Sequence, residues 1–490
     1  MMQRNKKQWL RPILVLFLSF ISPLWAANKP LYLSLHDAIL LSLRFSPAVK
    51  GAEIQRVVDK FNLAVAKNQF EFQYALTGFA NQSNSVSNGN SLFQQGVYNA
   101  TPTISRQNVY GTQYNLSMAN PVTVTKIPGL NSAYYNPALT LQVVQPIIQG
   151  SGREIVESNL NQAITTEKTT EVFYKAAIMN KVTQVIIDYW AVVSAEALLQ
   201  FAKKSLDDAH QTVIENKERI KLGFMAVSEN VQAESTVASQ ELQVASAEYV
   251  LLSAKNNLLR DIGLSPETKV TVNKSIAVEQ ANYPKGEDAK RILFANNPDY
   301  LIALNNLKNS KLSLLQAEDK QRWFLNLTGT VTQGGGAGGG ANSNLQSLYN
   351  GLNRNRNLGL QLIVPIDNLP LQQQLVAAKV AYTQQQLVVQ DLRLALESNL
   401  ISSLENLRIL FMQVKLARNA ERLANQSYHD ALKKIQFGQS SMFEVTTLQS
   451  TYISNTQTTI NTEISYLDAV AQYQNLLGIT LEKQDVNLVY

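Results

Sequence analysis

The sequence predicts a mainly helical fold with a smaller amount of β-structure, built from two tandem structural repeats. Three observations lead to this class. The same blocks of residues recur in the same order in both halves of the chain, two long stretches lack internal Gly and Pro, and four short stretches alternate apolar and polar residues. The first repeat is expected over residues 27–283 and the second over residues 284–490, after an N-terminal targeting segment.

Residues 1–26 have the three-part layout of a secretory signal peptide. A basic start precedes an uncharged, mostly apolar stretch over residues 12–25, and the small residues Ala26 and Ala27 follow as cleavage positions. The basic residues are Arg4, Lys6, Lys7 and Arg11. The apolar stretch falls short of the ~20 residues that a membrane-spanning helix needs, which argues against an uncleaved anchor. The mature chain is therefore expected outside the cytoplasm, without a transmembrane helix.

The composition argues against an enzyme. Cysteine is absent, which excludes disulfides, thiolate metal sites and a catalytic thiol, and the three histidines (His36, His210 and His429) lack metal-ligand spacing. His210 follows Asp207 and Asp208, a run that we interpret as a solvated helix face. Removal of the signal peptide lowers the net charge from +6 to about +2, which leaves no case for nucleic-acid binding. We expect no cofactor and no metal.

The repeat sets the order of elements within each half. At an offset of 251 residues Pro47 matches Pro298, and the run 76–78 (Leu-Thr-Gly) matches 327–329. In each copy a helix, predicted over 46–68 or 298–319, leads into a strand, a polar glycine-bearing loop and a second strand. The tract Gly334–Gly340 lies in the second loop and lacks the Lys-Ser/Thr of a phosphate-binding loop, so we interpret it as a flexible extracellular loop.

The predicted strands place apolar residues on one face and polar residues on the other. A secreted chain without a transmembrane helix enters a bilayer only through strands closed into a barrel, and apolar-out, polar-in alternation is typical of such strands. Four strands are too few to close a barrel, so they are either pooled between subunits or form a buried sandwich face. A further possible strand, Tyr110–Met118, is not counted as spanning. The residues expected to face lipid are Phe72, Tyr74, Leu76, Leu139, Leu141, Trp323, Leu325, Leu327, Leu358, Leu360 and Leu362.

Each repeat then continues into a long helical hairpin. The first long helix is predicted over 151–221 and the second over 371–436, both with a narrow apolar stripe of the coiled-coil kind. Gly223 and Gly438 follow these helices as left-handed terminators. Returning helices are expected over 227–262 and 443–477.

With these elements in place, nearly all of residues 28–490 resembles the TolC-type outer-membrane factor (outer membrane efflux protein) family. The resemblance is carried by the opening Leu33–Ala38 with Ser46-Pro47, the strand endings Gln145-Pro146 and Val364-Pro365, and the turns Arg219–Gly223 and Lys434–Gly438. It implies a homotrimer in the bacterial outer membrane, in which each chain lends four strands to one twelve-stranded barrel. A long α-helical coiled-coil barrel continues it through the periplasm, with a belt made by 28–45, 264–297 and 479–490.

The resemblance also assigns roles to the hairpin turns. A periplasmic adaptor (membrane fusion) protein would contact Leu222, Gly223, Val227, Ser228, Phe437, Gly438 and Ser441. Glu229 and Glu444 would form carboxylate rings that constrict the closed periplasmic mouth, or would cap the returning helices, and the two roles are compatible. The chain departs from the family pattern at Ser440, where an Arg can lock the mouth, and at Thr447, where an acid is common, so a different closing network is expected.

The predicted function is a passive exit duct of a tripartite efflux or type I secretion system, gated at the periplasmic tip and driven by an inner-membrane transporter. The alternative is a soluble periplasmic coiled-coil adaptor or scaffold without a pore, which would be released without detergent. Neither the exported substrate nor the class of pump, whether ABC, RND or another, follows from the residues. Outer-membrane lipid is the remaining expected partner.

Overall fold

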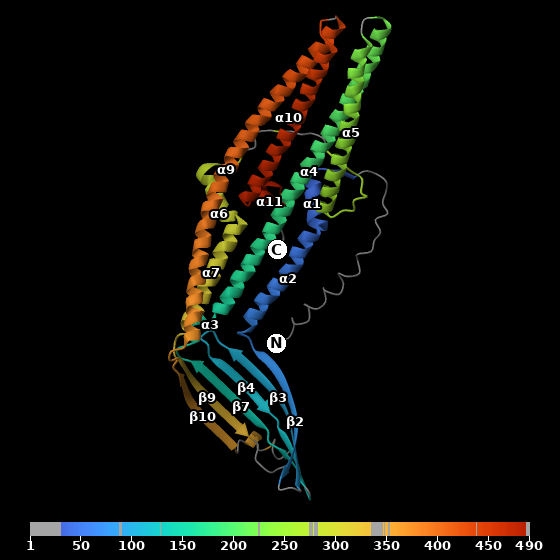
Figure 1. Ribbon diagram of the computed structural model, residues 1–490. Helices are drawn as coiled ribbons and strands as arrows, with labels where there is room; N and C mark the ends of the chain where they lie inside the picture. Colours follow the sequence, from blue (N-terminus) through green and yellow to red (C-terminus); the bar gives the residue numbers. More distant parts are fainter. Residues whose placement is uncertain are drawn as a thin grey trace. The chain divides into compact units, whose positions relative to one another are not determined.

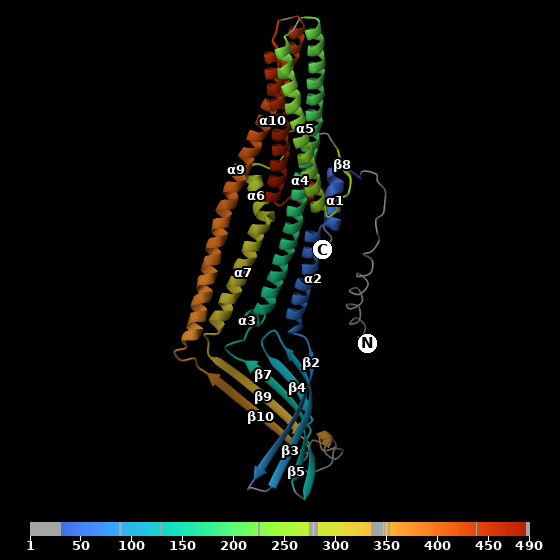
Figure 2. The same ribbon diagram turned by 45° about the vertical axis from the view of Figure 1, so that its right-hand side comes forward.

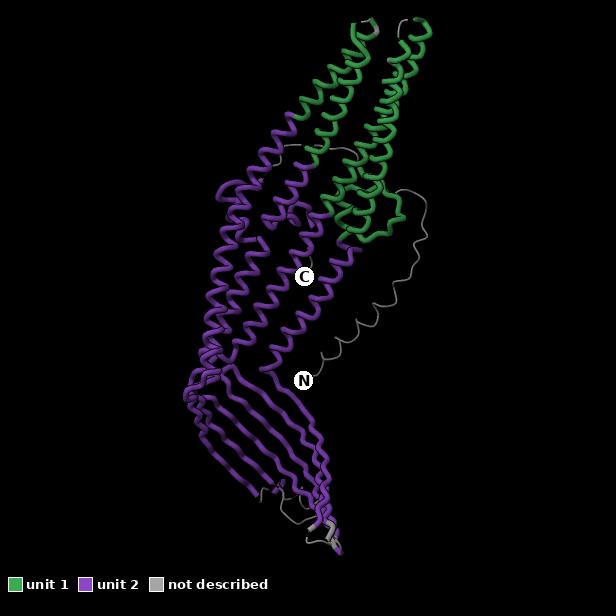
Figure 3. The backbone as a smooth tube through the Cα atoms, in the orientation of Figure 1, with its two compact units in different colours: residues 1–42, 185–278, 417–464 green, residues 43–184, 279–416, 465–490 purple. Residues whose placement is uncertain are grey.

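The computed structural model describes most of the chain after the predicted signal peptide, which itself lies outside the described residues. The described residues are 31–87, 91–127, 129–223, 226–273, 278, 283–334, 346, 348–350, 353–437 and 439–486. Most of the glycine tract therefore also lies outside them. The chain divides into two compact units (Figure 3), the first made of 1–42, 185–278 and 417–464 and the second of 43–184, 279–416 and 465–490.

Four long helices dominate the chain and lie close to their predicted bounds. α4 (Ser158–Lys221) and α9 (Leu369–Gln436) are the long helices, and α5 (Val227–Ile262) and α10 (Met442–Leu476) return from them. The start of the first predicted long helix forms a separate short helix, α3 (Arg153–Val156). Gly223, in the turn after α4, has a φ of 78°, which an L side chain rarely adopts.

The shorter helices occur in two pairs of equal length. α1 (Leu35–Phe45) and α2 (Pro47–Asn68) begin and end 251 residues before α6 (Gly286–Asn296) and α7 (Pro298–Asp319). Both α2 and α7 begin with Pro, whose fixed φ suits the first turn of a helix. A last short helix, α11 (Thr480–Lys483), follows α10. β1 (Leu31–Leu33) and β8 (Val270–Val272) form a small parallel sheet in the first unit that the sequence analysis did not predict.

The second unit contains one large antiparallel sheet (Figure 1). Its strands are β2 (Gln73–Ser87), β3 (Ser91–Gln107), β4 (Gln113–Ala119), β5 (Val122–Ile127), β6 (Leu130–Tyr135), β7 (Ala138–Pro146), β9 (Phe324–Gly334) and β10 (Asn353–Ile363). At the end of the sheet that joins α2 and α9, the strands lie in the order β10-β9-β7-β4-β3-β2 (Figure 2). At the opposite end of β3, the β5–β6 hairpin takes the place of β4 as its partner.

The large sheet has more strands than the four expected in each chain. β3 and β4 lie between the predicted strands β2 and β7, so six strands lie side by side. The possible strand at 110–118 is present as β4, which starts at Gln113 and pairs with β3 on one side and β7 on the other. The prediction failed because β3 carries Pro102, several polar residues and Arg106, which together hide its alternation.

A local break in the sheet accommodates Pro102. β3 pairs with β4 through residues 103–107 and with β5 through residues 94–98, so Pro102 falls in the gap between these two partners. Asn120 fills the gap: its N–H donates to Asn99 Oδ1 (2.9 Å) and its Nδ2 donates to the Ala100 carbonyl (3.0 Å). A proline without an N–H is tolerated here because no ladder bond is required of it.

One described helix, α4, is long and apolar enough to cross a membrane by length and composition. An 18-residue window in it has a mean hydropathy of 1.4, and half of that window is buried inside the protein. Elsewhere along α4 as well as in this window apolar side chains are buried, and the buried residues of α4 include Met179, Val182, Ile186 and Val193. Much of this apolar surface therefore packs against other parts of the protein.

Candidate functional sites: the two-faced sheet and the hairpin turns

The strand register gives the large sheet one apolar face. Successive partners across the six strands form a row on this face, consisting of Tyr74, Ile104, Leu116, Leu141, Val331 and Arg356. Side chains alternate along a strand, so residues an even number of positions away share the face. They include Leu76, Leu139, Leu327 and Leu358, and Leu358 is 80% exposed. This face is apolar and open in the single chain.

The opposite face is polar. The neighbouring row consists of Ala75, Thr103, Ser117, Thr140, Thr332 and Asn355. The hydroxyl groups of Thr140 and Thr332 lie 3.2 Å apart across β7 and β9. β7 has nine residues and β9 and β10 have eleven each, within the ~9–11 residues that a tilted strand needs to cross a bilayer. The sheet can therefore separate lipid from water.

The structure brings the predicted lipid-facing residues together on the apolar face. Nine of them belong to strands β2, β7, β9 and β10, and the strand register places all nine on that face. Phe72 and Trp323 lie just before β2 and β9 and are both 55% exposed.

The two hairpin turns lie at the same end of the first unit (Figure 1), and apolar side chains flank both of them. Leu222 and Val227 flank the first turn, Phe437 and Phe443 flank the second, and all four are exposed. Ser228 and Ser441 are also exposed. Of the predicted turn residues, Gly438 lies outside the described part of the chain.

Glu444 has a clear local role. Ser441 precedes α10, and its hydroxyl accepts the backbone N–H of Glu444 (3.2 Å). The Glu444 carboxylate in turn accepts a hydrogen bond from the Ser440 hydroxyl (3.0 Å). Ser441 and Glu444 thus have the spacing of a capping box, and the carboxylate lies in the first turn, where the helix dipole favours a negative charge. Glu229 occupies the matching first turn of α5, but its side chain lies outside the described part of the structure.

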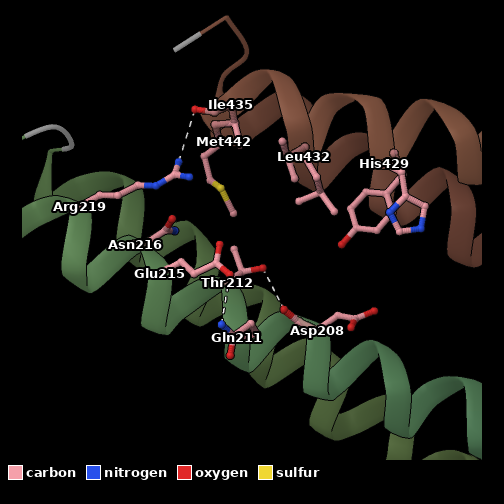
Figure 4. Close-up of a pocket in the computed structure, with 12 residues that line it drawn as sticks. Asp208, Gln211, Thr212, Glu215, Asn216, Arg219, His429, Leu432, Ile435 and Met442 are labelled. Atoms are coloured by element: carbon pink, nitrogen blue, oxygen red, sulfur yellow. Dashed lines mark hydrogen bonds between the residues drawn. The ribbon is translucent and has the colours of Figure 1, made fainter. Parts of the chain in front are cut away.

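A cavity of about 200 Å³ separates the two hairpins within the first unit (Figure 4). α4 contributes Asp208, Glu215 and Arg219, and α9 contributes Tyr428 and His429. Further lining residues are Gln211, Thr212, Asn216, Leu432, Ile435, Met442 and Val445. No group of three His, Asp or Glu residues suited to a metal ion occurs here or elsewhere among the described residues.

One hydrogen bond bridges the hairpins beside this cavity. Arg219 Nη1 donates to the Ile435 carbonyl at 3.5 Å, and this carbonyl belongs to the last turn of α9. The last carbonyls of a helix lack intrahelical partners and carry partial negative charge, so a guanidinium is a favourable neighbour. Behind it, Val213, Ala233 and Met442 form a small buried cluster that links α4, α5 and α10.

The family model for outer membrane efflux proteins matches residues 43–264, a little under half of the chain. The matched stretch, residues 43–264, is similar to the outer membrane efflux proteins. This match and the two-faced sheet both point to the bacterial outer membrane. A search of curated protein sequences gave no match.

Solved outer membrane channels share the fold of this chain. VceC of Vibrio cholerae has a TM-score of 0.69 at 15% identity, covering 91% of this chain and 96% of its own. CmeC of Campylobacter jejuni has a TM-score of 0.67 at 14% identity, with coverages of 93% and 90%. The open state of MtrE of Neisseria gonorrhoeae has a TM-score of 0.68 at 14% identity, with coverages of 91% and 89%.

Burial raises the pKa values of two residues beside the cavity, Asp208 and Tyr428. Desolvation raises the pKa of Asp208, and the charge of Asp207 adds to this while Lys204 and His429 oppose it. Burial, together with the charge of Asp208, raises the pKa of Tyr428 to about 12. The charged form of Asp208 therefore destabilises the folded protein relative to the neutral form. The Tyr428 ring is stacked on Tyr452, with ring centroids 6.1 Å apart.

The Asp208 shift predicts how the hairpin contact depends on pH. Because its folded-state pKa is raised, the stabilisation from neutral Asp208 is complete below the ordinary value of 3.8 and is lost as pH rises through the folded-state value. Asp208→Asn should therefore slow amide hydrogen exchange in residues 205–216 at neutral pH, and this gain should vanish under acid conditions. Asp207→Asn, at the exposed neighbouring position, is the control. Equal effects of both variants would contradict this account.

Sequence reasoning missed the residues that border this cavity. Asp207 and His210 are exposed as interpreted, but Asp208 of the same run is half-buried and lines the cavity. Arg219 was noted only as part of the turn motif, and its partner at Ile435 lies 216 residues away. The sequence signal for this contact was the position of Arg219 in the last turn of α4. A basic side chain there can donate to the free carbonyls at the end of its own helix or of the other long helix.

Proposed function

We propose that this chain is the exit duct of a tripartite efflux or type I secretion system. Three copies close a channel, a periplasmic adaptor binds the hairpin turns, and an inner-membrane transporter supplies the energy. The observation that carries the proposal is the sheet, which has one apolar face, one polar face and two open edges. Purified full-length protein in mild detergent should be a trimer and should conduct ions across a planar lipid bilayer; a monomer, or a bilayer without current, would refute the duct.

The open edges of the sheet support closure by copies of the chain. Among the described residues β2 pairs only with β3, and β10 pairs only with β9. An unpaired edge in a bilayer costs several kcal/mol per unsatisfied backbone group, so β10 of one copy would pair with β2 of the next. Six strands from each of three copies would give an eighteen-stranded wall instead of the expected twelve. Barrels of 16–18 strands leave an aqueous channel.

The helices that adjoin the two edges have matching apolar stripes. On α2, which precedes β2, the exposed apolar residues are Ile54, Val57, Val58, Phe61 and Val65. On α9, which follows β10, they are Val376, Val380, Leu387, Val388, Leu394 and Ile401. The other side of α2 is fixed within the chain, because Arg56 pairs with Glu167 of α4 at 2.9 Å. The free stripes would pack α2 of one copy against α9 of the next.

The α2 stripe predicts a substitution that blocks assembly. Phe61→Lys would place an ammonium group in the packed interface between copies, where an unpaired buried charge costs several kcal/mol. We expect monomers, or loss of the oligomer on mild heating, measured by native mass spectrometry. Gln55→Lys, at an exposed position beside the stripe, should leave the oligomer unchanged. Normal assembly of the Phe61 variant would place the interface elsewhere.

Gating is proposed at the hairpin turns. The Arg219 hydrogen bond to Ile435, beside the cavity, would hold the two hairpins of one chain together in the closed state. This replaces the lock that Ser440 and Thr447 do not supply: Ser440 instead binds Glu444, and the Thr447 hydroxyl donates to the Phe443 carbonyl. Opening would separate the hairpins by a hinge or shear movement.

The exposed turn residues suit the two remaining proposed roles. Leu222, Val227 and Phe437 offer apolar contacts for an adaptor hairpin, and solvent-exposed apolar residues gathered in one place mark interaction sites. Glu444, and Glu229 at the matching position, would form carboxylate rings when three copies meet. The capping bond at Glu444 holds its carboxylate in place without removing its charge, so capping and constriction are compatible.

A further inference from the structure

A hollow of about 650 Å³ opens on the apolar face of the sheet, over β3, β4 and β7. Its apolar part is formed by Phe72, Ile104, Leu116 and Leu141, and its polar part by Arg106, Asn108 and Tyr114. None of the residues that line it is acidic. An arginine on a largely apolar face requires an explanation, since a charge in the hydrocarbon region is costly.

Arg106 is held in a defined position. Its Nε donates to the Phe70 carbonyl at 3.2 Å, and its guanidinium carbon lies 4.9 Å from the centre of the Phe72 ring. Its Nη groups make no hydrogen bond or ion pair with the described residues. A guanidinium has five N–H donors in a fork that matches phosphate oxygens, so most of its donors remain available to a ligand.

The groups in the hollow follow the order of groups in a phospholipid. Arg106 and Tyr114 are cross-strand partners near the ends of β3 and β4 that meet at the turn 108–112. Gly111 in that turn lies against Gly150 and Val156, at the start of the helices that follow β7. Ile104 and Leu116 are also cross-strand partners, two residues further from that turn. Moving along the strands away from the helices, the surface therefore changes from cationic and polar to apolar.

We propose that this hollow binds an anionic glycerophospholipid of the periplasmic leaflet, with its phosphate on Arg106 and an acyl chain over Ile104, Leu116 and Leu141. The inference rests on the proposed function, in which the apolar face is the outer surface of the membrane wall. An anionic head group is favoured over a zwitterionic one because no carboxylate in the hollow could receive an ammonium group. Arg106 thereby keeps its charge at the membrane interface, where it is satisfied by lipid phosphate.

The chain offers a matched control on the same face. Arg356 lies on β10, near the end of that strand away from α9, and lines a different hollow with Leu141, Val331 and Leu358. It therefore has the same charge and faces the same side of the sheet. The proposal places Arg356 near the opposite leaflet, so its removal should leave binding at Arg106 unchanged.

The test is native mass spectrometry of the full-length protein in mild detergent, titrated with phosphatidylglycerol or with phosphatidylethanolamine of the same acyl chains. Phosphatidylglycerol should bind more tightly to the unsubstituted protein. Arg106→Gln should weaken this binding by about tenfold, as expected for loss of one charge-assisted contact, and Arg356→Gln should not. Ile104→Trp keeps the charge but fills the apolar part of the hollow, and it should also displace the lipid.

Oligomeric state and bilayer conductance, measured on the same preparations, distinguish a failure of the lipid site from a failure of the duct. Assembled, conducting Arg106→Gln protein with weakened phosphatidylglycerol binding supports the lipid site. Unchanged binding in that variant, equal loss in Arg356→Gln, or equal affinity for the two lipids overturns the site and leaves the duct standing. An unsubstituted protein that neither assembles nor conducts would overturn the duct, and the lipid site with it.

Discussion

Joining residue 219 of α4 to residue 435 of α9 with a short cleavable cross-linker should abolish channel opening in planar lipid bilayers. The chain has no cysteine, so Arg219→Cys with Ile435→Cys creates one unique pair. Before cross-linking, the variant should open more often than the unsubstituted protein, because it lacks the hydrogen bond from Arg219 to the Ile435 carbonyl. After cross-linking the hairpins cannot separate, and the openings should disappear until the linker is reduced.

A second cysteine pair controls for the linker itself. Lys203 of α4 and Glu248 of α5 form an ion pair at 3.0 Å within the first hairpin. Cross-linking cysteines at these two positions joins helices that are expected to move together, so openings should persist. Openings that survive complete cross-linking of the 219–435 pair would place the gate elsewhere in the protein.

The parts of the fold that sequence could predict are those set by local chemistry. Gly223 follows the end of α4 as expected because its φ of 78° favours glycine. The absence of internal Gly and Pro marked the bounds of α9 and the end of α4 closely, whereas α4 begins later than the predicted residue 151, at Ser158, after the separate helix α3. β9 and β10 were recognisable because Leu alternates with Thr, Gly or Gln along them. In each case the signal lies within a few neighbouring residues.

The parts that sequence could not supply depend on distant partners. The sequence of β3 does not predict a strand because Pro102 and Arg106 interrupt its alternation of apolar and polar residues. Only the gap between the partners β4 and β5 shows why Pro102 is tolerated. The bridge from Arg219 to Ile435 joins two hairpins far apart in the chain, and no local pattern pairs them. The same holds for Asp208, whose burial depends on helices that pack against α4.

The two faces of β9 predict opposite outcomes for adjacent arginine substitutions. Leu327 belongs to the apolar face and pairs with Leu360, whereas Thr328 belongs to the polar face and pairs with Gly359. Leu327→Arg should destabilise the membrane wall in every copy, by up to the ~2–4 kcal/mol that a lipid-facing arginine costs at the bilayer midplane. We expect little assembled protein in the outer-membrane fraction, measured as heat-resistant oligomer.

Thr328→Arg supplies the same side chain one residue away and is the matched control. Its guanidinium would lie in water on the lumen side, so the oligomer should form in normal amounts. The added positive charges should instead shift the reversal potential in a salt gradient toward anion selectivity, because lumen residues set the field inside a barrel. If the Thr328 variant lost assembly and the Leu327 variant kept it, the faces would be reversed and the apolar face would not be the one in contact with lipid.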